Sequence, residues 1–208
     1  MILPTLYVIA DASTLAERGV GLADFARELR AADVELVQYR DKAGSPQAVL
    51  HAARVLREAM AGSGCRLILN DRADLAVLAG FDGVHVGQGD LEPEDARRVV
   101  GAERMVGVST HTESQVRAAE LSCADYVAIG PAFATGTKTD AEQVVGLEGV
   151  RRARALTTKP LVAIGGITRA NARSVIDAGA GSVAVISALF APGESVEQVA
   201  RDFLELLR

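Results

Sequence analysis

The sequence predicts an α/β fold, a single-domain (β/α)8 TIM barrel over residues 1–208, and three observations support this prediction. Eight short apolar runs rich in Val, Ile and Leu recur along the chain. Segments with helical patterning alternate with these runs, which is typical of βαβ units. The runs are continuously apolar, as expected for parallel strands buried on both faces. A doubly wound open sheet is the alternative, but the eight runs and the lack of a GxGxxG motif after the first one favour the barrel.

The predicted strands and helices follow one another along the whole chain. The strands are LYVIAD (6–11), VELVQYR (34–40), RLILND (66–71), GVHVG (83–87), MVGVST (105–110), DYVAIG (125–130), LVAIGG (161–166) and SVAVIS (182–187). Apolar residues at helical spacing predict helices in GLADFARELRAA (21–32), PQAVLHAARVLREAM (46–60), TESQVRAAELS (112–122), ANARSVIDAG (170–179) and VEQVARDFLELLR (196–208). Because 208 residues is short for this fold, we expect few additions to the barrel.

Composition and charge exclude several classes of protein. The 49% hydrophobic content indicates a folded globular chain, and the net charge of −5 argues against a surface built mainly to bind nucleic acid. Cys65 and Cys123 stand outside any CxxC pair, which favours buried thiols in a reducing compartment over a disulfide. The sequence contains neither a signal peptide nor a segment long enough to span a bilayer, so we expect a cytoplasmic protein.

Each predicted strand ends in, or is followed by, polar residues or glycines. In chain order these are Asp11; Gln38, Arg40 and Lys42; Asn70 and Asp71; Gln88 and Asp90; Ser109 and His111; Thr135, Thr137 and Lys138; Gly165 and Gly166; and Ser187. The carboxyl ends of barrel strands meet at one rim, where such folds carry their sites. A single polar strand end is usually a turn former, but eight consecutive ones indicate a binding site at that rim.

The charged residues of this set suit a diphosphate and a metal ion. Arg40, Lys42 and Lys138 offer a planar fork and two point charges, both of which suit phosphate oxygens. Asp71 and Asp90 follow neighbouring strands, and two carboxylates beside phosphate oxygens suit Mg²⁺. Asp71 could instead cap a helix that begins near residues 72–73. No HxH or HExxH pattern in the sequence supports a zinc site.

Glycine-containing strand ends suit a phosphate monoester. AIGGIT (163–168) and ISALF (186–190) each follow a strand and are expected to open a helix, so that backbone N–H groups and a helix N-terminus could hold phosphate. Phosphate sites after the seventh and eighth strands are a recurring use of this barrel. The loop GPAFATGTKTDAEQ (130–143) is long for a strand–helix connection, and with Thr135 and Thr137 it suits a closing lid.

Two histidines and the two anion sites complete the prediction from residues. His85 is expected to be packed or to support the rim, whereas His111 is either a general acid–base or a positioning residue. Diphosphate is a good leaving group when metal and cations neutralise its charge. The residues therefore predict displacement of diphosphate by a second, phosphorylated substrate.

Several motifs together resemble one enzyme family. They are QYRDK, LILNDRADLA, GVHVGQGDL, GVSTH, GPAFATGTK, AIGGIT and GAGSVAVISALF, and they run from about residue 34 to 190. As a set they are similar to thiamine-phosphate synthase, although no single motif would be specific. The resemblance implies a (β/α)8 barrel that joins hydroxymethylpyrimidine diphosphate to a thiazole phosphate, with thiamine monophosphate and diphosphate as products. It also suggests a possible homodimer.

The resemblance assigns roles to residues of this chain. Those implied to bind the pyrimidine diphosphate are Gln38, Arg40, Lys42, Asn70, Ser109 and Lys138, those implied to bind Mg²⁺ are Asp71 and Asp90, and those implied to bind the thiazole phosphate are Thr135, Thr137, Gly166, Ile186 and Ser187. The implied mechanism is dissociative: diphosphate leaves, a pyrimidine-stabilised carbocation forms, and the thiazole nitrogen attacks. No general base is obligatory in that mechanism, so it gives His111 no necessary chemical step.

Two other functions remain as alternatives. Thiazole tautomerases share this barrel, with a catalytic histidine where His111 stands, but they tend to lose the diphosphate and metal residues that this chain keeps. A phosphate-binding module without catalysis, in which the acids are only caps, is the other alternative. The chain departs from the synthase pattern at Asp41, where Glu is commoner, and at Ala132 and Ala134, where bulkier residues are frequent. These departures leave each named ligand in place, and the two alanines change the side chains of the loop expected to contact the thiazole.

Overall fold

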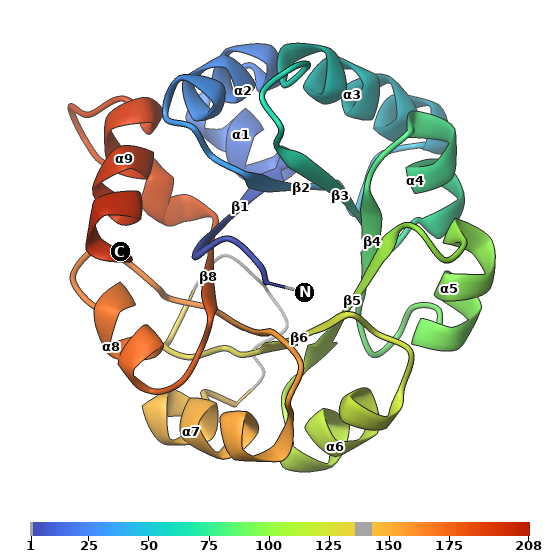
Figure 1. Ribbon diagram of the computed structural model, residues 1–208. Coiled ribbons are helices and arrows are strands. Elements are labelled where there is room, and N and C mark those ends of the chain that lie inside the picture. The colour runs from blue at the N-terminus through green and yellow to red at the C-terminus, as the bar shows by residue number, and fades with distance from the viewer. Residues whose placement is uncertain (1, 136–142) are drawn as a thin grey trace.

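The computed structural model describes residues 2–135 and 143–208, which form a closed barrel of eight parallel strands (Figure 1). The strands are β1 (Leu6–Asp11), β2 (Leu36–Arg40), β3 (Arg66–Asn70), β4 (Gly83–Val86), β5 (Met105–Thr110), β6 (Tyr126–Ile129), β7 (Leu161–Ile164) and β8 (Ser182–Val185). Each strand pairs with the next in sequence, and β8 closes the barrel against β1. The predicted single-domain (β/α)8 fold is therefore confirmed.

Helices form a ring outside the strands (Figure 1). They are α1 (Ala12–Arg18), α2 (Leu22–Ala31), α3 (Pro46–Ala59), α4 (Ala73–Ala79), α5 (Pro93–Val100), α6 (Glu113–Leu121), α7 (Gly146–Leu156), α8 (Ala172–Asp177) and α9 (Val196–Leu206), with one 3-10 turn, η1 (Ser187–Leu189). The apolar spacing did not single out α1, α4, α5 and α7, although a helix beginning near residues 72–73 was expected if Asp71 acts as its cap. The first three are short, and α7 contains Gly146 and Gly149, which weaken a helical signal.

Local sequence explains where the helices begin. Ser45 accepts a hydrogen bond from the Ala48 N–H, and Pro46 occupies the first turn of α3, where its missing N–H costs nothing. Thr112 and Gln115 form a capping box at the start of α6, in which each side chain bonds the backbone of the other residue. These caps fix the helices at the strand ends and so fix the loops that carry the site.

Two apolar cores surround the strands. The larger core lies between the strands and the helix ring and includes Phe25, Phe81 and Phe203. The smaller core fills the barrel interior and includes Leu36 and Ile68. Because successive strand residues alternate between these two cores, the last interior residue of each strand faces the open end of the barrel.

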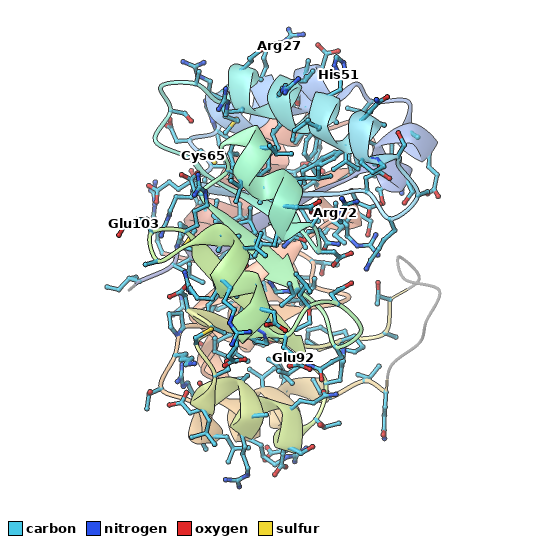
Figure 2. The ribbon with its side chains drawn as sticks, turned by 90° about the vertical axis from the view of Figure 1, so that its right-hand side faces the viewer. Arg27, His51, Cys65, Arg72, Glu92 and Glu103 are labelled. Carbon is cyan, nitrogen blue, oxygen red and sulfur yellow. The ribbon has the colours of Figure 1, made fainter. Side chains whose placement is uncertain are left out.

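The two ends of the barrel are distinct in side view (Figure 2). Glu103 precedes β5 and lies at the left, whereas Arg72 follows β3 and lies toward the right, where the carboxyl ends of the strands open. Both cysteines are free; Cys65 is half-buried and Cys123 exposed, so the expectation of buried thiols is wrong for Cys123, which lies in the α6–β6 connection. No helix within the described ranges is long and apolar enough to cross a membrane.

Candidate active site

The carboxyl ends of β2, β3 and β5 place four predicted residues around one hollow of about 30 Å³ in the mouth of the barrel. Gln38, Arg40, Asn70 and Ser109 line it, with Tyr7 and His85 beneath them. Gln38 is buried and Arg40 lies two residues further along β2, so the alternation of strand residues turns both toward the interior. The structure therefore brings together the polar strand ends that the sequence singled out.

Asp11 holds the Arg40 side chain in this hollow. An Arg40 Nη1 donates to Asp11 Oδ2 at 2.5 Å, and the Asp11 side chain is only 2% exposed. The other carboxylate oxygen of Asp11 accepts from Ser13 Oγ, from Thr14 N and from Thr14 Oγ1, which also caps α1. Burial opposes ionisation, but these hydrogen bonds and Arg40 outweigh it and lower the pKa of Asp11. A carboxylate is thus buried here with its charge balanced.

Lys42 lies between the two predicted metal ligands. Its Nζ is 2.5 Å from Asp71 Oδ2 and 4.0 Å from Asp90 Oδ1. Asp90 is oriented by the Gly87 N–H, which donates to its Oδ2 at 2.8 Å. Asp71 adopts φ +61°, a left-handed conformation uncommon for residues other than glycine. Such local strain is typical of functional positions.

The alternative role of Asp71 as a helix cap is wrong. The residue before α4 is Arg72, and no side chain caps that helix start. Asp71 instead directs its carboxylate to Lys42. The left-handed backbone turns the side chain toward the rim rather than along the helix that follows.

The two carboxylates differ in their affinity for protons. Burial raises the pKa of Asp71, and the neighbouring Asp90 carboxylate raises it further, against the opposing effect of Lys42. Burial also acts to raise the pKa of Asp90, but its hydrogen bonds to Asp71 and the Gly87 N–H, together with Lys42, lower it overall. Opposite shifts of this kind are typical of two neighbouring acids that ionise one after the other rather than independently.

A cavity of about 470 Å³ adjoins the hollow on the β7–β8 side. Its walls include the loops after β7 and β8 and six predicted residues, namely Ser109, His111, Thr135, Gly166, Ile186 and Ser187. Ser109 and Ile186 line both spaces, so the two are contiguous. The cavity also contains Arg18 from the end of α1, whose guanidinium lies 5.9 Å from the centre of the Phe190 ring.

Gly165 and Gly166 form a tight backbone wall of this cavity. Their φ values are +99° and +63°, and a Cβ at Gly166 would lie 2.5 Å from the Ala134 carbonyl oxygen. The expectation that AIGGIT opens directly onto a helix is wrong, since α8 begins only at Ala172. ISALF likewise forms a single 3-10 turn, η1. Positive φ and a short turn suffice to point backbone groups at the cavity, so the wall is made of loop backbone rather than helix N-termini.

The two histidines lie in different surroundings. His111 lines the larger cavity, and its Nδ1 lies 2.7 Å from the Gly130 carbonyl oxygen. Nδ1 must be the donor in that bond, because a carbonyl oxygen only accepts. His85 is buried, with Nδ1 3.0 Å from Tyr126 Oη and Nε2 2.8 Å from Ser109 Oγ. This agrees with the supporting role expected for His85.

Some predicted residues lie outside the described ranges, and some site residues were not predicted. Thr137 and Lys138 belong to the first group, as does half of the 130–143 loop expected to act as a lid. Asp11 was noted as a strand end but not as the partner of Arg40. Arg18, Tyr7 and Tyr126 were not considered; only the period-2 position of the tyrosines within their strands could have indicated that they face the barrel interior.

The fold and the residues at its carboxyl-terminal rim suit one class of protein, the (β/α)8 barrel enzymes that act on phosphorylated ligands. The family model described as Thiamine monophosphate synthase matches residues 6–189. A thiamine-phosphate synthase of Koribacter versatilis is 53% identical over 207 residues, covering 99% of this chain and 96% of that protein. Another from Methanoregula boonei is 43% identical over 200 residues, covering 96% and 91%.

A solved structure leads to the same family. The thiamine phosphate pyrophosphorylase from Pyrococcus furiosus superposes with a TM-score of 0.84 at 29% identity, over 98% of this chain and 95% of that one. The chain belongs to the thiamine monophosphate synthase family. This confirms the resemblance seen in the motifs and the predicted class of enzyme, a transferase of thiamine biosynthesis.

Proposed function

We propose that this chain joins hydroxymethylpyrimidine diphosphate to a thiazole phosphate, releasing thiamine monophosphate and diphosphate in a Mg²⁺-dependent reaction. One observation carries the proposal: two sets of ion pairs, Arg40 with Asp11 and Lys42 with Asp71 and Asp90, lie on the same rim as a glycine-walled cavity. The ion pairs suit a diphosphate with metal, and the cavity suits a phosphate monoester. The family membership of the chain supports the same pair of substrates.

The pyrimidine diphosphate would occupy the β2–β5 side of the rim. Gln38, Asn70 and Ser109 line the hollow and offer amide and hydroxyl groups to a heterocycle. Arg40 would hold diphosphate oxygens with the guanidinium nitrogens that Asp11 does not use, since an arginine has five N–H donors. Lys42 would exchange its bond with Asp71 for one with the diphosphate, and we assign Lys138 to the same group.

The carboxylates of Asp71 and Asp90 fit a Mg²⁺ ion. They are hard oxygen donors that already converge on one cation, the Lys42 ammonium, so the charge balance of the cluster suits a metal that would take its place. Mg²⁺ is commonly held by one or two carboxylates together with phosphate oxygens of a substrate. When bound, it would neutralise charge on the departing diphosphate.

The thiazole phosphate would occupy the larger cavity on the β7–β8 side. Gly166, Ile186 and Ser187 would supply backbone and hydroxyl groups to the phosphate, and Thr135 and Thr137 would contribute from the β6–α7 loop. Arg18 provides a cation at the cavity wall. This arrangement would leave the thiazole ring facing the hollow where the pyrimidine binds.

The reaction follows from this placement. The bond between the pyrimidinylmethyl carbon and the diphosphate oxygen breaks with its electron pair left on oxygen, where Arg40 and Lys42 neutralise it. The thiazole nitrogen then donates its lone pair to that carbon, and the nitrogen carries the positive charge of the product. No proton is lost in these steps. His111, whose Nδ1 is bound to the Gly130 carbonyl, therefore positions the thiazole in this scheme.

A two-substrate assay with and without Mg²⁺ tests this function. We expect thiamine monophosphate only when both substrates and Mg²⁺ are present. Failure to form product at any metal concentration would refute the proposal. A thiazole tautomerase would isomerise its substrate without metal, lose activity in His111→Ala and keep it in Asp90→Ala. A non-catalytic phosphate-binding module would bind ligand in calorimetry with no response to Mg²⁺ or to Asp71→Asn.

Two further assignments belong to the proposal. We place the enzyme in the cytoplasm, because both described cysteines are free thiols, one of them exposed, which suits a reducing compartment. We also keep a homodimer as a proposal, which sedimentation of the purified protein would test.

A further inference from the structure

A line of hydrogen bonds crosses the barrel interior below the candidate site. Gln38 Nε2 donates to Tyr7 Oη at 2.7 Å, Tyr7 Oη lies 2.9 Å from Tyr126 Oη, and Tyr126 Oη lies 3.0 Å from His85 Nδ1. His85 Nε2 then lies 2.8 Å from Ser109 Oγ. We call these five residues the relay. Its two ends, Gln38 and Ser109, are both residues of the small hollow.

The relay is buried where a barrel is usually filled by apolar side chains. Tyr126 is 0% exposed and Tyr7 is 1% exposed, and both belong to the interior core. Polar groups in such surroundings are retained at a cost in free energy unless each is hydrogen-bonded. Here the Tyr7 and Tyr126 hydroxyls each have a hydrogen-bond partner on both sides, so the two fully buried hydroxyls of the line are satisfied.

Gly107 makes room for the relay. A Cβ at this position of β5 would lie 2.0 Å from Tyr126 Cζ and 2.3 Å from Tyr126 Oη. Glycine within a strand costs stability and often marks a place where another group approaches closely. β5 therefore has no side chain at the point where the Tyr126 ring lies across the barrel interior.

The hydrogen bonds of the relay must all run in the same direction. Tyr7 accepts from the Gln38 amide, so its own hydrogen goes to Tyr126, and the Tyr126 hydrogen goes to His85 Nδ1. A neutral imidazole that accepts at Nδ1 carries its hydrogen on Nε2, which donates to Ser109. The Gln38 carbonyl oxygen and the Ser109 hydroxyl hydrogen therefore make no bond within the relay. Both groups are available to a ligand in the hollow.

Among the hydrogen bonds between the relay residues themselves, the opposite direction also satisfies every member. It requires Gln38 to turn its carbonyl to Tyr7 and moves the His85 hydrogen to Nδ1, so Ser109 must donate to His85. Burial raises the pKa of both Tyr7 and Tyr126 above the ordinary value of 10.0, so both hydroxyls stay neutral. The two ends of the relay are consequently linked by hydrogen-bond direction rather than by charge.

We propose that Tyr126, with Tyr7 and His85, is a positioning residue that couples the hydrogen-bonding direction of Gln38 to that of Ser109. In the direction found, the hollow presents an acceptor at Gln38 and a donor at Ser109. A heterocycle with an amine on one edge and a ring nitrogen on another, such as an aminopyrimidine, meets both groups in only one orientation. The identity of this ligand rests on the proposed function; the relay itself does not.

The position of the His85 hydrogen tests the coupling in the ligand-free protein. Nitrogen-15 correlation spectra at about pH 8, above the ordinary histidine pKa, distinguish the two neutral tautomers. We expect the hydrogen on Nε2 in the unmodified protein. The substitution Gln38→Glu places a carboxylate that only accepts, so it should reverse the relay and move the hydrogen to Nδ1. A His85→Gln spectrum assigns the signal among the three histidines.

Breaking the relay should abolish that response. In Gln38→Glu combined with Tyr126→Phe, the His85 hydrogen should no longer follow residue 38. Tyr39→Phe is the matched control, because Tyr39 is also a buried tyrosine of the barrel, but its hydroxyl bonds Asp41 outside the relay. Reversal that persists without Tyr126, or no reversal in Gln38→Glu alone, overturns the proposal. If Tyr126→Phe does not fold, Tyr7→Phe breaks the same line.

A kinetic measurement separates positioning from general stability. Tyr126→Phe should raise the KM for the pyrimidine diphosphate about tenfold, a loss of about 1.4 kcal/mol, and leave the KM for the thiazole phosphate unchanged. Equal increases in both KM values would contradict a positioning role. A failed synthase assay with an intact tautomer response would refute the proposed function alone, whereas working synthesis without that response would refute the relay alone.

Discussion

The two halves of the rim carry different kinds of groups that could bind an anion. The β1–β4 half uses charged side chains in ion pairs: Arg40 with Asp11, and Lys42 with Asp71. The β7–β8 half uses a glycine backbone wall and the Ser187 turn, with Arg18 at its edge. In the proposed reaction the diphosphate gains charge as it leaves, whereas the thiazole phosphate keeps the same charge throughout. In this proposal, ion pairs that can exchange partners bind the diphosphate, whose charge changes during the reaction. Fixed backbone groups bind the thiazole phosphate, whose charge stays the same.

Arg40→Ala should have the largest effect, because it removes a cation from the half where charge develops. Truncating one member of a buried charge pair costs about 2–5 kcal/mol, so we expect kcat/KM for the pyrimidine diphosphate to fall roughly 30-fold or more. The Asp11 carboxylate is also left unpaired, which should lower the free energy of unfolding. Steady-state kinetics and chemical denaturation measure the two losses.

A double variant separates these two losses. Asp11→Asn together with Arg40→Ala removes the unpaired charge but keeps an oxygen able to cap α1. Stability should recover while kcat/KM stays low. Recovery of both would mean that Arg40 matters only for folding and would break the comparison between the two halves.

The Asp71–Asp90 pair should make metal binding sensitive to pH. Burial and the Asp90 carboxylate raise the pKa of Asp71 above 3.8, and Mg²⁺ competes with a proton for that carboxylate. Mg²⁺ affinity in the presence of diphosphate, measured by calorimetry, should therefore begin to fall at a higher pH than for an ordinary aspartate. Asp71→Asn should bind more weakly and lose this pH dependence. An unchanged pH dependence in that variant would contradict the assignment.

The same shift predicts an effect on stability without metal. A carboxyl group whose pKa is higher in the folded than in the unfolded protein favours the folded state at low pH, and this contribution is lost as the pH rises through the folded pKa. Asp71→Asn should thus raise the melting temperature of the metal-free protein at neutral pH. The gain should shrink as the pH falls through the raised pKa of Asp71. An equal increase in melting temperature at all pH values would indicate that the pKa of Asp71 is ordinary.

Gly166→Ala should affect the backbone half alone. Its φ of +63° and the close Ala134 carbonyl make any side chain strained there, at a cost of about 1–3 kcal/mol. We expect the KM for the thiazole phosphate to rise about tenfold and that for the pyrimidine diphosphate to stay constant. Gly64→Ala is the matched control, because Gly64 has φ +75° with open space around it and precedes β3 at the other end of the barrel. Similar kinetics for both variants would count against a phosphate wall.

The sequence predicts one half of the site better than the other, and the reason is physical. Arg40, Lys42, Asp71 and Asp90 could be placed because a strand alternates its side chains and barrel strands share one rim. The Asp11–Arg40 pair could not, since it depends on the register between β1 and β2, where these two residues are direct neighbours. Apolar patterning predicts that strands exist, but it does not predict which polar ends will touch.

The backbone half and the relay were harder to predict. The sequence located Gly165 and Gly166 but suggested a helix N-terminus beside them, because the five residues between Gly166 and α8 form a loop that carries no periodic signal. In the sequence, Tyr7 and Tyr126 do not differ from ordinary aromatic residues of a strand, because tyrosine is common in strands. Their hydroxyls meet only because strands far apart in the chain close one barrel.

Arg18→Gln should have the smallest effect and sharpens the comparison most directly. Arg18 is an exposed side chain at the cavity wall, lying over the Phe190 ring, and a screened surface charge contributes at most about 1 kcal/mol. The KM for the thiazole phosphate should rise roughly threefold at low salt, and the effect should vanish at high salt because exposed charges are screened. Arg40→Ala should keep most of its effect in the same salt series, since its ion pair is largely buried. The contrary result is an Arg18→Gln variant whose KM rises as much as that of Arg40→Ala and does not respond to salt. The thiazole phosphate would then be held by charge rather than by backbone groups, and the two halves of the rim would recognise anions in the same way.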